Sequence, residues 1–258
     1  MNLLAIDIGN TTVNFGLFEN DKLKKKTKIY SREMPRRRIP YTGFDDAVIA
    51  SVVPALTRVV SGKIKKLPGG KSITVLDSTN IPLKLKVDNP AQVGADRIVN
   101  AAAAAEIYGC PAVVIDMGTA TTFDVVSKNC EYTGGVIAPG ISMSLDALHE
   151  KTSKLPRVNL KIPKGVVGKN TEDAIISGII FGNVGMIKEV MSRVGSRKSE
   201  AVREKVKNKK WKVILTGGYS EIFAKYFPGF ELDPDMTLKG LNIIYKKIVS
   251  KYTGGGKR

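Results

Sequence analysis

The chain has 258 residues, more than one typical domain, and 43% of them are hydrophobic, which is enough to build the core of a two-lobed globular protein. Its net charge of +17, from 41 Lys and Arg against 24 Asp and Glu, favours an anionic substrate or a nucleic-acid partner. The basic residues are spread along the chain without aromatic residues repeated among them. We therefore expect a solvated, lysine-rich surface and rank nucleic-acid binding as the weaker alternative.

Two further features limit the class of protein. No apolar run reaches the ~18 residues that a membrane span needs, and Met1 leads straight into a predicted strand without a signal-peptide pattern. Cys110 and Cys130 are the only cysteines, too few for a disulfide framework or a zinc site, so we expect buried thiols. His149 is the only histidine, and Ser-His-Asp chemistry therefore has little support. We predict a cytoplasmic protein that does not enter a membrane.

The first predicted strand covers residues 3–8, carries Asp7 near its end and runs into a glycine-containing turn at residues 9–12. Apolar residues alternate over 13–17, so the turn joins two strands. Such a tip can bring backbone N–H groups and threonine hydroxyls to phosphate oxygens, with the carboxylate facing the anion through a metal ion. The chain has no G-x-x-x-x-G-K-[ST] or G-x-G-x-x-G pattern. A single Asp-x-Gly turn is equally typical of an ordinary hairpin.

The following segment, residues 22–41, is basic and contains prolines, which indicates an edge strand or a loop. Residues 47–54 predict a buried strand that a proline ends, 56–66 a short basic helix, and 72–76 a further strand.

Polar residues gather at 88–97, directly before a helix with an alanine-rich face. Asp96 and Arg97 fall in its first turn, where unpaired backbone N–H groups and the helix dipole favour a carboxylate, so Asp96 could simply cap the helix. The alternative is functional. Gly94 and Ala95 would keep the approach open, while Asp96 stands beside an acceptor hydroxyl and Arg97 beside an anionic group of the substrate.

The pattern of hydrophobic strand, acidic residue and glycine turn then recurs. A strand over 112–116 ends in Asp116, the turn contains Gly118, and the chain continues as a strand through 123–126. The two aspartates lie 116 − 7 = 109 residues apart. This repetition favours duplicated half-molecules with a nucleotide between them.

The remaining elements of the second half are assigned from the same signals. Gly178, Gly182 and Gly185 punctuate one long apolar helix and would allow another element to approach its backbone closely. A strand over 211–218 ends in Gly217-Gly218, which can pass beneath a nucleoside or can be a plain strand-to-helix turn. The other predicted elements are a strand over 134–140, a helix over 143–151 capped by Ser142, a basic and partly helical stretch over 193–205, a helix over 220–226 and a last helix over 237–251.

Together these motifs resemble those of the type III pantothenate kinases, in the sugar kinase, heat-shock ATPase and actin superfamily, over nearly the whole chain. Residues 7–11 resemble the family's first phosphate motif, 94–97 its pantothenate motif and 116–122 its second phosphate motif. Four more stretches follow its pattern: 134–140, 154–156, 168–171 and 233–240.

The resemblance implies an α/β fold of two duplicated actin/ribonuclease H-like lobes with mixed sheets and a nucleotide cleft between them. We place the lobes at 1–107 and 108–258, with the last helix a candidate to pack back on the first. The implied reaction transfers the γ-phosphoryl group of ATP to the primary hydroxyl of pantothenate, the first step toward coenzyme A.

Residue roles also follow from the resemblance. Asp96 matches the proposed general base, which phosphoryl transfer can use without an elevated pKa, and the substrate site takes Gly94, Ala95, Arg97 and Thr171. Asp7 matches a carboxylate near the triphosphate and its divalent cation, such as Mg²⁺, and Asp116 matches one associated with a monovalent cation, K⁺ or NH₄⁺. The predicted ATP and phosphate site consists of Asp7, Gly9, Asn10, Thr11, Thr12, Gly118, Thr119, Thr121, Gly217 and Gly218.

Members of this family are homodimers whose substrate pocket the partner subunit completes, so the helix around 178–185 is a candidate interface. Two departures affect the expectation. Residues 29–44 are too short and proline-rich for the helix that the family carries there, which predicts a less covered first sheet, a more exposed sheet edge or an altered dimer. Val87 stands where the family often has tyrosine. Two alternatives remain: a regulatory homologue that binds nucleic acid or protein, and a kinase for another small hydroxylated acid.

Overall fold

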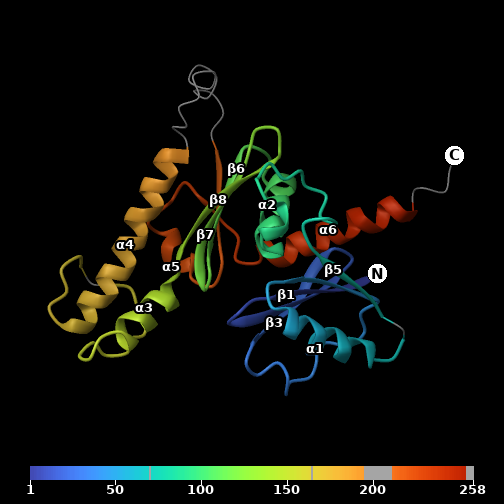
Figure 1. Cartoon of the computed structure of the whole chain (residues 1–258), viewed down its shortest axis with the longest axis horizontal. Coiled ribbons are helices and arrows are strands. Elements are labelled where there is room, and N and C mark those ends of the chain that lie inside the picture. Colours follow the sequence, from blue (N-terminus) through green and yellow to red (C-terminus); the bar gives the residue numbers. More distant parts are fainter. Residues whose placement is uncertain (70, 164, 195–210, 254–258) are drawn as a thin grey trace. The chain divides into compact units, whose positions relative to one another are not determined.

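The fold consists of two mixed five-stranded sheets with helices, in a computed structural model that describes all residues except 70, 164, 195–210 and 254–258 (Figure 1). The strand order is β3-β2-β1-β4-β5 in the first sheet and β8-β7-β6-β9-β10, read from the opposite end, in the second. The second order is therefore the first repeated along the chain. This confirms the α/β class and the duplication that the two glycine turns predict.

The first sheet is formed by β1 (Asn2–Ile8), β2 (Thr12–Glu19), β3 (Lys22–Tyr30), β4 (Asp46–Ser51) and β5 (Ser72–Leu76). β1 pairs antiparallel with β2 and parallel with β4, so it lies at the point where the sheet changes direction. β3 is an edge strand, and its exposed lysines discourage pairing with another chain.

Helices and a loop cover the two faces of this sheet. Alternate residues of β1 point to opposite sides: Leu3 and Ala5 pack with α2 (Ala95–Ile107) and α6 (Met236–Thr253), and Leu4 and Ile6 pack with α1 (Pro54–Lys65). Each fully buried leucine or isoleucine side chain contributes about 1.5–3 kcal/mol to folding. Because both faces of β1 are covered, the strand reads as a continuous apolar run.

The segment between β3 and β4 differs from the expectation of a poorly covered sheet. Residues 31–45 are described throughout and form turns without a helix, yet Met34 and Phe44 are fully buried in the core on the α1 side. Ile39 joins them. Three apolar side chains carried by a loop thus cover the face that a helix would otherwise cover.

The second sheet is formed by β6 (Ala112–Met117), β7 (Ala120–Val126), β8 (Tyr132–Pro139), β9 (Lys212–Thr216) and β10 (Glu231–Leu232). Its helices are α3 (Ile141–Glu150), α4 (Thr171–Val194) and α5 (Ser220–Ala224). The predicted Ser142 cap is wrong: α3 begins at Ile141, Gly140 occupies the cap position, and no side chain caps it. The predicted basic stretch over 193–205 lies mostly outside the described residues.

The long helix α4 differs from two expectations. Gly178, Gly182 and Gly185 lie on its exposed side, and a Cβ added at any of them would meet no atom within 4 Å, so no element of the described chain approaches there. By length and composition α4 could also cross a membrane, contrary to the expectation that no segment could. This is weak evidence, because a core helix passes the same test, and Ile176, Ile180 and Ile187 are fully buried.

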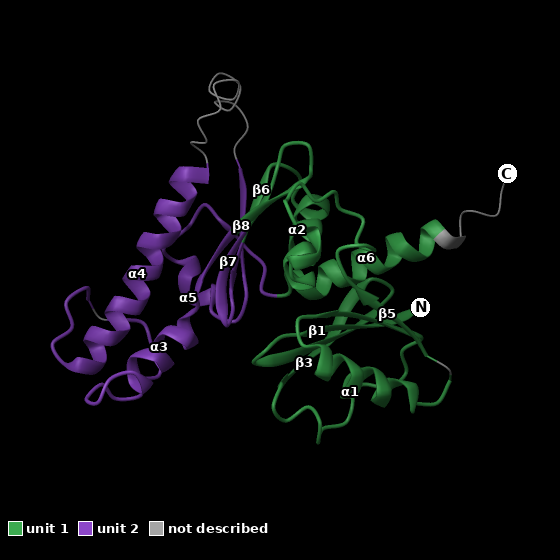
Figure 2. Ribbon diagram, viewed as in Figure 1, with its two compact units in different colours: residues 1–114, 124–135, 235–258 green, residues 115–123, 136–234 purple. Residues whose placement is uncertain are grey.

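Contacts divide the chain into two compact units (Figure 2). Unit 1 comprises Met1–Val114, Asp124–Gly135 and Asp235–Arg258, and unit 2 comprises Ile115–Phe123 and Val136–Pro234. Within unit 1 the last helix, α6, packs against α2 and β1. The lobe boundary at residue 107 stays a prediction.

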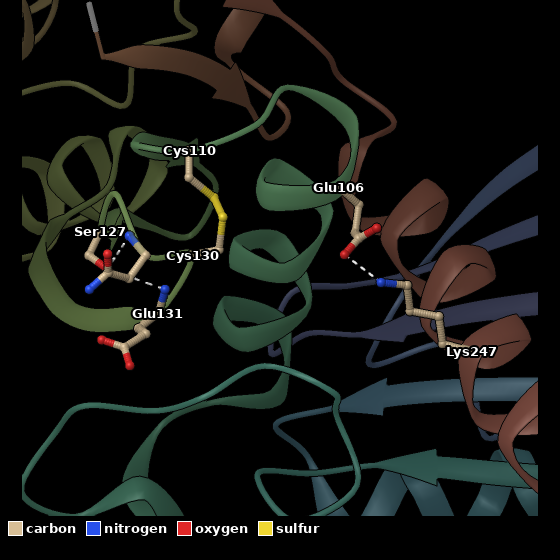
Figure 3. The surroundings of a disulfide bond; sticks show 7 residues. Glu106, Cys110, Ser127, Cys130, Glu131 and Lys247 are labelled. Carbon is tan, nitrogen blue, oxygen red and sulfur yellow. Dashed lines mark hydrogen bonds and ion pairs between the residues drawn. A yellow bond between two sulfur atoms is a disulfide. The ribbon is translucent and has the colours of Figure 1, made fainter. Parts of the chain in front are cut away.

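The two cysteines form a disulfide, so the expectation of buried thiols is wrong (Figure 3). Cys110 precedes β6 and Cys130 follows β7, where it is exposed, and their Cα atoms lie 5.5 Å apart. An antiparallel hairpin brings its two ends together, which is why residues 20 positions apart can bond. The disulfide therefore closes the base of the β6–β7 hairpin.

Candidate active site

The turn between β1 and β2 is a tight hairpin tip. Gly9 N–H donates to Thr12 O at 2.9 Å, and Ser31 braces the tip through its backbone N–H to Thr11 O at 2.9 Å and its hydroxyl to Gly9 O at 2.7 Å. Asn10 and Thr11 are exposed at the tip. The predicted phosphate-binding residues of this turn are thus held in a defined conformation at the surface of unit 1.

Asp7 lies at the end of β1, largely shielded from solvent. Asn14 Nδ2, on the paired strand β2, donates to its Oδ2 at 3.0 Å. Burial raises the pKa of Asp7 to about 6, against a lowering by the Asn14 amide, and the charge of Asp96 adds a further rise. Ionised Asp7 is therefore costly in this environment, and a nearby cation would reduce that cost.

Asp96 lies in the first turn of α2, beside a glycine that its position requires. Arg97 N–H donates to Asp96 Oδ1 at 2.8 Å, and Gly94 occupies the cap position with no side-chain cap bond. A Cβ on Gly94 would lie 2.5 Å from Asp96 Oδ1, so a side chain at position 94 would displace the carboxylate from this place. Burial raises the pKa of Asp96 above the usual aspartate value, with hydrogen bonds and the charge of Arg97 opposing it.

Arg97 reaches a residue that the sequence analysis missed. Its Nε donates to Asp124 Oδ1 at 2.7 Å, its Nη2 lies at the same distance from that oxygen, and Tyr132 OH donates to Oδ1 at 3.0 Å. Asp124 is completely buried, and burial raises its pKa to about 6 although Arg97 and Tyr132 lower it. The signal was present in the sequence: an aspartate inside the apolar strand Phe123–Val126 requires a buried partner.

In unit 2 the second turn is shaped by close backbone contacts. Gly118 N–H donates to Ala120 O at 3.1 Å. Gly217 has a φ of +88°, and a Cβ there would lie 2.3 Å from Asp116 Oδ1. A Cβ on Gly140 would lie 2.2 Å from Thr119 O. The structure thus brings Asp116, Gly118, Thr119 and Gly217 close together within unit 2.

Two further predicted site residues occupy different surroundings. Thr121 on β7 is fully buried, and its Oγ1 has no hydrogen-bond partner in the described structure. Thr171 is exposed at the first residue of α4, after Asn170, whose Oδ1 accepts from Asp173 N–H at 2.8 Å and whose Nδ2 donates to Asp173 Oδ2 at 2.9 Å. This reciprocal pair caps α4 and fixes the position of Thr171.

The described residues contain no group of three or more His, Cys, Asp or Glu side chains arranged to hold a metal ion. The donor set nevertheless fits Mg²⁺ accompanying a nucleotide, since Mg²⁺ is usually bound by one or two carboxylates plus the substrate's phosphates. Asp7 would supply such a carboxylate. A monovalent cation also prefers oxygen ligands, and Asp116 offers a carboxylate beside the Gly217 backbone.

Comparison with known proteins identifies the family of these motifs. The family model described as type III pantothenate kinase matches residues 3–193. Proteins of the same name include one from Dehalococcoides mccartyi, 38% identical over 95% of this chain and 97% of its own, and one from Moorella thermoacetica, 37% identical over 95% and 99%. A third, from Halalkalibacterium halodurans, is 38% identical over 96% and 100%.

Solved structures support the fold. A protein from Campylobacter jejuni described as a Baf family transcriptional activator aligns with a TM-score of 0.62 at 22% identity, over 97% of this chain and 99% of its own. MreB 5 of Spiroplasma citri, bound to AMPPNP, aligns with a TM-score of 0.53 at 10% identity, over 98% of each chain. At these identities the alignments show the shared architecture alone.

Proposed function

The chain belongs to the type III pantothenate kinase family and is a pantothenate kinase of coenzyme A biosynthesis, and from this premise we propose how its own residues carry out the phosphoryl transfer. The relatives that match nearly the whole chain all carry the name type III pantothenate kinase, which favours this function over the two alternatives, a regulatory homologue and a kinase for another acid. The observation that supports the residue assignment best is the environment of Asp96: a partly buried carboxylate with a raised pKa, which a side chain in place of Gly94 would displace.

ATP is bound through its phosphates at two glycine turns. Backbone N–H groups and hydroxyls of Gly9, Asn10, Thr11 and Thr12 serve at the first turn, and Gly118 and Thr119 serve at the second, with Gly217-Gly218 beside the nucleoside. Thr121 is fully buried in β7, so it supports the second turn from within the sheet and does not contact a phosphate itself. A divalent cation, when bound, neutralises charge on the transferring phosphoryl group, and Asp7 holds it.

Asp96 accepts the proton of the pantothenate hydroxyl. Phosphoryl transfer proceeds through a loose transition state, so the base needs correct position more than great strength. The raised pKa nevertheless helps, because a base is most effective when its pKa lies nearer the working pH. Burial thus raises the pKa of Asp96 beyond what the expected mechanism requires.

The substrate is oriented by Arg97, which faces the pantothenate carboxylate, with Gly94 and Ala95 leaving the approach open and Thr171 adding a hydroxyl contact. Arg97 suits this role because its planar guanidinium binds a carboxylate through parallel hydrogen bonds. Val87 lacks the hydroxyl that the family often has there, and it lies against Gly134, where an added Cβ would be 3.7 Å from Val87 Cγ1.

A monovalent cation, K⁺ or NH₄⁺, binds at Asp116 and activates the enzyme. The support is that the Asp116 carboxylate lies against the backbone of Gly217, where an added Cβ would be 2.3 Å from its Oδ1. Titrating KCl at constant ionic strength should give saturable activation in the wild type. Asp116→Asn should shift that titration to higher K⁺ by about tenfold or more, because an interaction with a charged group is worth about 1.5–3 kcal/mol.

The enzyme acts as a homodimer through α4. Its exposed side carries Gly178, Gly182 and Gly185 with open space above each, and Val166 and Val167 nearby in sequence are 66% and 85% exposed. Such a smooth, partly apolar surface is typical of a helix that packs against another chain. Light scattering should give twice the 28.0 kDa chain mass, and Gly182→Glu should return the chain to monomer.

We further infer a cytoplasmic location, since the relatives are metabolic kinases and α4 buries its isoleucines in the protein. Cell fractionation tests this directly. Recovery of the full-length protein from the membrane fraction after a carbonate wash would contradict it.

The decisive experiment measures ADP formation in the steady state with ATP, Mg²⁺ and a panel of small hydroxylated acids, with and without K⁺. We expect turnover with pantothenate that depends on K⁺ and weak turnover with the other acids. Equal turnover across the panel would contradict pantothenate specificity, and turnover without regard to K⁺ would contradict the monovalent cation site.

A further inference from the structure

We propose that Asp124 is a positioning residue for substrate recognition: it sets the orientation of the Arg97 guanidinium, and through it the binding of the substrate carboxylate. The inference rests on the proposed function, in which Arg97 faces pantothenate. Asp124 lies on β7, 27 residues from Arg97 on α2, and both belong to unit 1.

Exposure separates the roles of the two residues. The side chain of Asp124 is 0% exposed, whereas that of Arg97 is 15% exposed. Asp124 therefore cannot touch a ligand from solvent, and any effect on the substrate must pass through Arg97. This is why we assign it to positioning and not to direct contact.

The bonding pattern constrains the guanidinium in one plane. Nε and Nη2 both lie 2.7 Å from the same oxygen, Asp124 Oδ1. These two nitrogens form one edge of the planar guanidinium, so the edge that carries Nη1 points away from Asp124. An arginine side chain otherwise samples many rotamers, and fixing it before the substrate arrives lowers the entropy lost on binding.

Tyr132 holds Asp124 and also the segment that leads to the substrate motif. Its hydroxyl donates to Asp124 Oδ1 at 3.0 Å. Its backbone N–H donates to Lys84 O at 2.9 Å, and Lys86 N–H donates to Tyr132 O at 2.7 Å. One buried residue thus supports both Arg97 and the strand-like stretch directly before residues 88–97.

Stability alone is a weak explanation for this buried ion pair. The desolvation of two charges offsets much of their attraction, and a buried pair is often no more stable than apolar residues of the same size. The pKa of Asp124, raised by burial in spite of Arg97, agrees with a costly ionised carboxylate. A geometric role explains why a charge occupies the middle of an apolar strand.

The first test is Asp124→Asn, which keeps the size of the side chain and removes its charge. A misplaced Arg97 guanidinium would lose charge-assisted hydrogen bonds to the substrate carboxylate, so we expect kcat/KM for pantothenate to fall about 10- to 100-fold, mainly through KM. The KM for ATP should stay within about twofold. Asp21→Asn, which removes the charge of an exposed ion pair with Lys246, is the matched control and should leave both constants unchanged.

An analogue in which a primary alcohol replaces the pantothenate carboxylate isolates the recognition step. The wild type should prefer the carboxylate substrate, and Asp124→Asn should lose most of that preference. In an Arg97→Ala background, Asp124→Asn should cause no further loss of kcat/KM for pantothenate, because the effect passes through Arg97. Equal losses in both backgrounds would overturn the proposal, as would an unchanged preference in Asp124→Asn.

Tyr132→Phe keeps the ion pair and the buried ring, and so tests the same idea if Asp124→Asn does not fold. We expect a smaller fall in kcat/KM than in Asp124→Asn, again larger for pantothenate than for the alcohol analogue. A fall of equal size for both substrates would overturn the proposal. The wild-type assay separates the two levels of inference: no turnover with pantothenate would refute the proposed function, whereas wild-type turnover with unaltered preference in the variants would refute only the role of Asp124.

Discussion

The β1–β2 and β6–β7 hairpins have the same place in their sheets and carry an aspartate at the same point, yet they are built differently. In the first, Gly9 N–H bonds to Thr12 O and encloses two residues, whereas in the second Gly118 N–H bonds to Ala120 O and encloses one. The second hairpin is also closed by a disulfide at its base. The two halves therefore share the strand topology but differ in the structure of the turn.

The returning strands differ in what they carry. Counted from Thr12 and Ala120, the fourth residues are Phe15 and Phe123, both fully buried, and the fifth are Gly16 and Asp124. Gly16 leaves room for Leu238 of α6, since an added Cβ would lie 3.2 Å from its Cδ1, while Asp124 bonds to Arg97 of α2. Core positions are therefore equivalent in the two halves, and single residues beside them give each half its own chemistry.

The largest expected effect concerns the neighbourhood of the first hairpin. Asp96→Asn should lower turnover on the order of 10²-fold or more, because the variant cannot accept the hydroxyl proton. In the wild type the acid limb of kcat/KM should lie above the ordinary aspartate pKa of 3.8, since burial raises the pKa of Asp96. A coupled ATP assay over pH 4–8 measures both. Undiminished turnover would remove Asp96 from the mechanism and leave the first hairpin with no adjacent base.

Asp7→Asn should separate stability from activity. The folded pKa of about 6 against 3.8 means that ionised Asp7 costs on the order of 3 kcal/mol, which the neutral amide removes. Because the folded pKa is raised, wild-type stability falls as pH rises from about 4 through 6, and the variant should be more stable at pH 7.5.

Urea unfolding at pH 7.5 and at pH 4 checks this expectation, and the pH 4 comparison is the internal control because Asp7 is then largely neutral in the folded protein, as asparagine is. Activity should be lost with the gain in stability, as is usual where a buried charge serves function. A variant that is less stable than the wild type at pH 7.5 would show that ionised Asp7 is already compensated within the chain.

The disulfide sharpens the contrast at the second hairpin. It closes a 20-residue separation, and the chain-entropy model assigns such a loop about 3 kcal/mol of stability. Cys110→Ser with Cys130→Ser should lose roughly that amount in urea unfolding, and a reductant should lower the stability of the wild type without affecting the double variant. Thiol titration of wild-type protein that is denatured without reductant should find no reactive thiol. Finding two would contradict the disulfide.

The smallest expected effect compares two adjacent glycines, of which only Gly217 lies against Asp116. Gly217→Ala places a side chain at positive φ and against the Asp116 carboxylate, which should cost about 1–3 kcal/mol. Gly218→Ala is the matched control, because an added Cβ there meets no atom within 4 Å. Thermal unfolding of the two variants measures the difference. Equal stability would show that the β9–α5 turn adapts easily, unlike the braced turn of the first hairpin.

Local patterns predicted most of the elements. The strand Ser72–Leu76 has the predicted bounds, both glycine turns join two strands, and α6 begins and ends within two residues of the prediction. These segments were accessible because alternation and helical periodicity depend on neighbours along the chain. The Ser142 cap failed for the opposite reason: α3 begins one residue before Ser142, and a boundary depends on the backbone path into the helix.

The sequence by itself determined the duplicated α/β topology, the two aspartate-containing turns and the placement of Asp96 and Arg97 at a helix start, since each is a short-range pattern of apolar, small and charged residues. Only the tertiary structure decided that Cys110 bonds to Cys130, that Met34 and Phe44 cover a sheet without a helix, and that Asp124 meets Arg97. These are contacts between residues distant along the chain, and they arise when separate strands and helices pack, a step that no local pattern records.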